Sequence, residues 1–105
     1  MPWKVVYYPG NPSPEDYIND LPLNEQSHVD QKLDYMEKNE SHLWRFVDHY
    51  EDKLWEIISG PHRFLYCLWK GQVVILHAVR KRGRRLKRKQ IEIALKRMQD
   101  VFENY

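Results

Sequence analysis

The pattern of apolar and polar residues predicts a strand and a short helix at the start of the chain. Residues 3–8 (WKVVYY) are β-branched and aromatic, which favours a strand. The proline- and glycine-rich residues 9–12 end it, because proline cannot continue a hydrogen-bonded ladder. Ser13 followed by Pro14 is typical of a helix N-terminus, so a short helix is expected over residues 14–20.

A second helix is predicted over residues 23–38, where apolar side chains recur at helical spacing and form a narrow stripe. The stripe consists of Val29, Leu33 and Met36. Residues 41–50 are ambiguous, since their apolar positions fit either a helical turn or an irregular crossing into a sheet.

The second half of the chain reads as a meander of strands. Residues 54–58 and 63–68 are apolar runs joined by a hairpin-like Ser-Gly-Pro-His connection. A Lys-Gly turn then leads into residues 72–79, the most apolar run and the expected centre of the sheet. An amphipathic helix is predicted over residues 86–103, with Lys87, Arg88, Lys96 and Arg97 available to solvent.

Composition favours one folded domain spanning residues 1–105. The chain is 42% hydrophobic and 13% aromatic, which argues against disorder. Cys67 is the only cysteine, so no internal disulfide can form; a small core thiol is favoured over a nucleophile. No apolar run is long enough to span a bilayer and no signal peptide follows Met1. The expected location is therefore cytoplasmic, without membrane association.

Charge is distributed unevenly along the chain. Residues 1–79 hold 7 Lys/Arg against 12 Asp/Glu, whereas residues 80–105 hold 10 against 3. Eight of the ten residues 80–89 are Lys or Arg. A solvated helix start is one interpretation, but cations at a helix N-terminus oppose the helix dipole. The concentration of charge favours a polyanion-binding surface, and RNA is the expected polyanion.

Three polar residues in the predicted strands are candidates for chemistry. Arg63 alternates onto the face of Leu65 and Cys67, where it either pairs with Glu56 or stabilises a phosphoryl transition state. Glu56 either orients Arg63 or accepts a proton, and the orienting role is favoured. His77 is favoured as a core or supporting histidine over a general base.

Other site classes find no support in the sequence. The five histidines fall in different elements, and no His-x3-His or Cys-x2-Cys spacing is present. There is no glycine-rich phosphate loop and no Gly-x-Ser-x-Gly elbow. We therefore expect neither a metal nor a cofactor.

With these residues in view, the chain resembles the HigB-like, phage-derived branch of the RelE superfamily of type II toxins. The resemblance runs from about Val5 to the C-terminus and depends on the order of four segments. These are residues 53–57 (KLWEI), 63–66 (RFLY), 74–81 (VILHAVRK) and 91–98 (IEIALKRM). Members commonly place a Thr- and Pro-containing stretch before the last helix, where this chain has residues 83–89 (GRRLKRK), which leaves the register of the catalytic cations open.

The resemblance implies an α+β domain, in which two N-terminal helices pack on a small twisted antiparallel sheet followed by a C-terminal helix. It implies cleavage of mRNA on the ribosome without a metal, through attack of the ribose 2′-hydroxyl on the adjacent phosphate. The implied partners are ribosome-bound mRNA and a cognate helix-turn-helix antitoxin. The catalytic candidates are Arg63, Lys81, Arg80 and Glu56, and the RNA-binding candidates are Lys53, His77, Arg82, Arg84, Arg85, Lys87 and Arg88.

Three classes of function stay open on the sequence alone. The first is this ribonuclease toxin. The second is a non-catalytic RNA- or ribosome-binding module on the same fold. The third is a protein whose basic segment binds an acidic protein partner.

Overall fold

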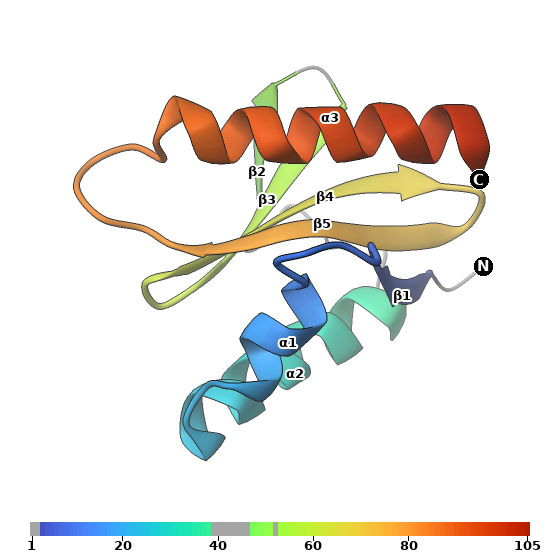
Figure 1. The fold of residues 1–105 in the computed structure, drawn as a ribbon. Helices are drawn as coiled ribbons and strands as arrows, with labels where there is room; N and C mark the ends of the chain where they lie inside the picture. The colour runs from blue at the N-terminus through green and yellow to red at the C-terminus, as the bar shows by residue number, and fades with distance from the viewer. Residues whose placement is uncertain (1–2, 39–46, 52) are drawn as a thin grey trace.

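A computed structural model describes residues 3–38, 47–51 and 53–105 as an α+β fold (Figure 1). Five strands form one sheet in the order β1-β5-β4-β3-β2. Strands β2 to β5 pair antiparallel, and β1 joins β5 in parallel. The elements are β1 (Lys4–Tyr7), α1 (Pro14–Asn19), α2 (Leu23–Lys38), β2 (Val47–Glu51), β3 (Leu54–Ser59), β4 (His62–Trp69), β5 (Gln72–Arg80) and α3 (Arg88–Asn104).

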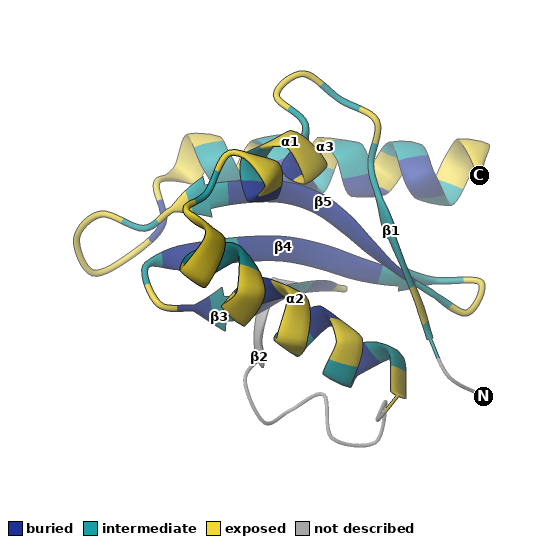
Figure 2. Cartoon of the chain, turned by 90° about the horizontal axis from the view of Figure 1, so that it is seen from below, coloured by how far each residue is buried: buried dark blue, intermediate teal, exposed yellow. Residues whose placement is uncertain are grey.

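The sheet separates two hydrophobic layers. Helices α1 and α2 cover one face and α3 covers the other (Figure 1). Figure 2 shows β4 and β5 buried along most of their length while the outer sides of α1 and α2 are exposed. The α1–α2 layer contains Ile18, Val29, Leu33, Met36, Ile57, Phe64, Tyr66, Val73, Ile75 and Ala78. The α3 layer contains Leu54, Leu65, Cys67, Val74, Leu76, Leu86, Ile91, Ala94, Met98 and Val101.

Local sequence explains where the elements begin and turn. Ser13 caps α1, since its hydroxyl accepts a hydrogen bond from the Asp16 amide at 3.3 Å. Lys70 and Gly71 both have positive φ (50° and 77°), as a two-residue hairpin turn between β4 and β5 requires. Gly60 also has positive φ, 58°, in the β3–β4 turn that precedes the candidate site.

A bulge in β5 changes which side chains face α3. Leu65 pairs with His77 while Tyr66 pairs with Ile75, so Leu76 is the extra residue. Simple alternation from Ile75 would point His77 toward α1 and α2. The bulge instead turns it to the α3 face, where it meets Gln90.

The predicted elements agree closely with the structure, with two differences. The sheet is mixed, because β1 pairs in parallel with β5. The middle position belongs to β4 and not to residues 72–79, since β1 adds to the far side of β5. The ambiguous residues 41–50 end in strand β2, whereas 39–46 lie outside the described residues.

Candidate functional site

Two of the predicted catalytic side chains, Arg63 and Glu56, lie with His77 on the α3 face of the sheet, near the N-terminus of α3. Glu56, Leu65 and His77 are register partners across β3, β4 and β5. Arg63 lies two residues nearer the β3–β4 turn than Leu65, and its register partner is Val79. Strand pairing therefore assembles these residues from three strands at the end of the sheet where the basic segment begins.

Arg63 is fixed from several directions. Its Nη1 donates hydrogen bonds to the carbonyls of Gly60 at 2.6 Å and His62 at 3.0 Å. Its Nε lies 3.1 Å from Glu56 Oε1, and the two side chains are only 12% and 9% exposed. Nε makes no aligned hydrogen bond within the described residues, so this contact acts through charge. The predicted pairing of Arg63 with Glu56 is thus confirmed as an ion pair.

His77 is buried beneath the start of α3. It is 3% exposed, and its Nε2 donates to Gln90 Oε1 at 2.6 Å. Burial lowers the pKa of His77; the Gln90 hydrogen bond opposes this shift, and the charge of Arg97 adds to it. The supporting role is therefore the one that its position favours, because a side chain so enclosed does not meet RNA directly.

The segment between β5 and α3, residues 81–87, extends beyond the sheet (Figure 1) and borders a pocket of about 340 Å³. Leu86 is 8% exposed and anchors the segment in the α3 layer. Within the described residues no side chain caps the start of α3, and its first turn carries no acid. The positive end of the α3 dipole and the clustered cations both favour an anion here. The pocket lining is Val79, Arg80, Arg82, Arg85, Leu86, Lys87 and Gln90.

The structure brings several of the predicted RNA-binding cations to this pocket. Arg82, Arg85 and Lys87 are exposed and line it. Arg84 is exposed but does not belong to the lining. Arg88 lies in the first turn of α3, and its Nε is 3.3 Å from Glu92 Oε1 on the outer side of the helix.

Lys53 lies away from this pocket, and the two members of the basic pair, Arg80 and Lys81, have different surroundings. Lys53 is placed over the ring of Phe102, at 5.6 Å, near the far end of α3. Arg80 lines the pocket and is the register partner of His62. Burial raises the pKa of Tyr17 and the charge of Arg80 lowers it, so Arg80 also acts on the α1–α2 face. Lys81 stays beside the turn that carries Arg63, because its amide donates to the Pro61 carbonyl at 2.8 Å.

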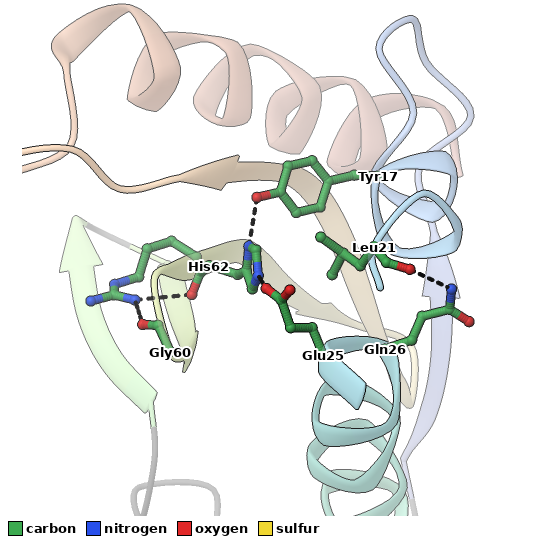
Figure 3. Close-up of polar contacts among 7 residues, drawn as sticks. Tyr17, Leu21, Glu25, Gln26, Gly60 and His62 are labelled. Atoms are coloured by element: carbon green, nitrogen blue, oxygen red, sulfur yellow. Dashed lines mark hydrogen bonds and ion pairs between the residues drawn. The ribbon is translucent and has the colours of Figure 1, made fainter. Parts of the chain in front are cut away.

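Sequence reasoning missed a polar cluster on the opposite face. His62 is 2% exposed and is hydrogen-bonded to Tyr17 from α1 and Glu25 from α2 (Figure 3). Lys32 of α2 donates to the Ile58 carbonyl at 2.7 Å; burial lowers the pKa of Lys32, as does the charge of Arg63. No spacing motif links these residues, since only the tertiary fold brings α1, α2 and β4 together.

Other candidate chemistry finds little support. Cys67 is buried, and burial raises the pKa of its thiol to about 12, as expected for a core thiol. In the part of the chain that the structure describes, no three His, Cys, Asp or Glu side chains gather as metal ligands would. The described helices include none that is long and apolar enough to cross a membrane.

A comparison with known protein families shows to which family the chain belongs. The family model described as phage derived protein Gp49-like (DUF891) matches residues 16–99, most of the chain. The chain belongs to the Gp49-like family. The match includes β3, β4 and β5, the basic segment and most of α3, so every residue of the pocket lies inside it. No curated protein sequence matches the chain.

Gp49-like proteins are associated with toxin–antitoxin systems and with toxin endoribonucleases. Membership therefore agrees with the class of function that the sequence favoured, and it suggests an antitoxin partner.

Proposed function

We propose that this chain is the toxin of a type II toxin–antitoxin pair and a ribosome-dependent mRNA endoribonuclease of the HigB-like kind. The observation that carries the proposal is the junction between Arg63 and the cationic pocket. Val79 lines the pocket and is the register partner of Arg63. A backbone phosphate held by Arg82, Arg85 and Lys87 would therefore lie next to a fixed guanidinium.

The proposed reaction needs no external nucleophile. The ribose 2′-oxygen forms a bond to the adjacent phosphorus as its proton passes to a base, and the bond from phosphorus to the 5′-oxygen breaks. The 5′-oxygen takes up a proton, which gives a 2′,3′-cyclic phosphate and a 5′-hydroxyl. Negative charge grows on the nonbridging oxygens during the attack, so the main task of the protein is to stabilise that charge and to align the phosphate.

Each side chain has a distinct role in this proposal. Arg63 meets the developing charge through the Nη2 edge of its guanidinium, because Nη1 and Nε face the Gly60 and His62 carbonyls and Glu56. Glu56 orients Arg63. Lys81, beside the same turn, supplies positive charge and a proton at the leaving 5′-oxygen.

A non-catalytic RNA- or ribosome-binding module on the same fold is the second candidate. The observation that favours it is the burial of Glu56 and His77, at 7% and 3% exposure, because a general base must reach the 2′-hydroxyl. On this alternative the pocket would hold phosphate without cutting. Binding of an acidic protein by the basic segment is the third.

Controlled expression in a bacterium tests the toxin assignment. We expect induction of the chain alone to stop growth, with new mRNA 5′ ends inside coding regions, and co-expression of a helix-turn-helix protein encoded next to it to restore growth. Arg63→Lys, which keeps the charge and loses the planar fork, should not arrest growth. Normal growth with abundant folded wild-type protein would contradict the proposal; growth arrest without new 5′ ends would favour the binding module.

A further inference from the structure

A buried chain of hydrogen bonds joins helices α1 and α2 to β4, the strand that carries Arg63. His62 Nδ1 lies 2.7 Å from the hydroxyl of Tyr17, and His62 Nε2 lies 2.7 Å from Glu25 Oε1 (Figure 3). We call these three residues the Tyr17–His62–Glu25 chain. It connects α1, α2 and β4 at one side chain that is only 2% exposed.

The two contacts assign the tautomer of the imidazole. A carboxylate can only accept, so Nε2 of His62 must carry a proton for Glu25. In a neutral ring Nδ1 is then an acceptor, and it receives the hydroxyl proton of Tyr17. The ring is also held edge-on to Tyr17, with centroids 5.6 Å apart. Position and orientation of the imidazole are thus fixed from both ends, in the way that paired partners fix a histidine elsewhere.

The same residue shapes the proposed active site through its backbone. The His62 carbonyl accepts from Arg63 Nη1 at 3.0 Å. His62 also pairs with Arg80, and the preceding Pro61 accepts from the Lys81 amide. Consecutive strand residues point to opposite faces of the sheet. The His62 ring therefore lies in the α1–α2 layer, while Arg63 lies on the α3 face, where the pocket is. A shift of the ring would therefore move the carbonyl that Arg63 binds.

We propose that Tyr17, His62 and Glu25 are positioning residues for Arg63: the Tyr17–His62–Glu25 chain holds the β3–β4 turn so that the guanidinium keeps its orientation. This inference rests on the proposed function, which makes Arg63 the group that meets the phosphate. Through the chain, the placement of α1 and α2 on one face sets the geometry of the site on the other.

Tyr17→Phe tests the chain with the smallest change, since the ring keeps its edge contact with Phe64 at 6.0 Å. The matched control is Tyr8→Phe, which removes a tyrosine hydrogen bond of similar length, 2.6 Å to Asp100, near the other end of α3. At Glu25, Gln keeps an acceptor for Nε2 and Leu removes it. Steady-state cleavage of ribosome-bound mRNA and 15N NMR of the Arg63 Nε–H and the His62 ring are measured on each folded protein.

We expect Tyr17→Phe and Glu25→Leu to lower kcat by about tenfold to a hundredfold with KM unchanged. A substitution far from the reacting atoms has this effect when it displaces a group, here Arg63, that acts on them. Both should shift the Arg63 Nε–H resonance, while Tyr8→Phe and Glu25→Gln leave kcat and that resonance near wild type. An unmoved Arg63 resonance in Tyr17→Phe and Glu25→Leu would overturn the inference. The NMR result decides it even if the wild-type protein proves not to cleave RNA, which would refute only the proposed function.

Discussion

In the proposed function Arg63 combines two roles that the sequence presented as alternatives. Its contact with Glu56 and its bonds to two turn carbonyls make it a structural residue. Its register partner Val79 lines the pocket, which fits the proposed role of Arg63 as a donor to a phosphate. The first role supports the second, because a guanidinium held in one plane loses less freedom when it binds a transition state.

Removal of Arg63 should therefore destabilise the protein as well as impair the proposed reaction. Arg63→Ala removes the cation that lies 3.1 Å from the buried Glu56 carboxylate, which costs about 3–5 kcal/mol of unfolding free energy. The double variant Arg63→Met with Glu56→Leu should recover part of this loss, because no lone buried charge is left. Urea denaturation of the single and double variants measures the difference. Equal stability of Arg63→Ala and wild type would show that the pair contributes nothing.

The buried His77 should make the stability of the protein depend on pH. Burial lowers its pKa in the folded state below the ordinary value of 6.5, so the unfolded chain binds a proton first as the pH falls. The stabilising contribution is complete above pH 6.5 and is lost as the pH falls below that value. His77→Gln should flatten the change in urea midpoint between about pH 7 and 5. His28→Gln, at an exposed histidine, is the control and should leave the slope unchanged.

Helix α3 is held on the sheet by a residue that periodicity had placed in solvent. Arg97 Nη1 donates to the Leu76 carbonyl at the β5 bulge, and Nη2 donates to the Pro12 carbonyl. Its guanidinium also lies 5.2 Å from the Tyr8 ring. A β-carbon at Gly10 would come within 2.6 Å of Nη2, so a larger residue there would displace the guanidinium from its position. The apolar stripe of α3 was predictable, whereas this contact depends on a bulge that no single-sequence pattern marks.

Arg97→Gln should lower the unfolding free energy by about 2–3 kcal/mol, since a charged donor to two carbonyls is lost. Its neighbour Lys96 is exposed, and Lys96→Gln is the matched control with an expected change below about 0.5 kcal/mol. Chemical denaturation of both variants measures the effect. If the two substitutions had the same small effect, Arg97 would not anchor the helix.

Two arginines in the segment of residues 81–87 allow a controlled test of phosphate binding. Arg85 lines the pocket and Arg84 does not, although both are exposed. Affinity for single-stranded RNA should fall with salt, and Arg85→Gln should reduce the log–log slope by about 0.7, the loss of one phosphate contact. Arg84→Gln should reduce it less. Replacing Arg84, Arg85, Lys87 and Arg88 together should flatten the dependence further, and an unchanged slope would rule out phosphate binding by this segment.

Across the entire chain, the sequence predicted the elements better than the site. Helical spacing, the Ser13 cap and the turn residues located the helices and the β3–β4–β5 meander, because those signals are local. The parallel pairing of β1 depends on a distant strand and was not predictable. The site divided in the same way: the basic segment is a local signal, whereas the partners of His62 follow from tertiary packing.

The two faces of the sheet carry different groups of polar residues. One face presents the cationic pocket and Arg63, and the other holds the buried Tyr17–His62–Glu25 chain beneath α1 and α2. A partner that displaced α1 and α2 would therefore disturb the proposed site without covering it. This arrangement agrees with a family associated with toxin–antitoxin systems, in which activity must be held in check.

The most direct test is end-group analysis of mRNA incubated with the purified protein and programmed ribosomes. We predict cleavage within the message only when ribosomes are present, with 2′,3′-cyclic phosphate and 5′-hydroxyl ends. Folded Arg63→Lys should cut on the order of 10²–10³ times more slowly, the loss typical of one preorganised donor. Uncut mRNA with ribosome-bound wild-type protein, or wild-type rates in Arg63→Lys, would contradict the assignment of Arg63 as the catalytic cation of an mRNA endoribonuclease.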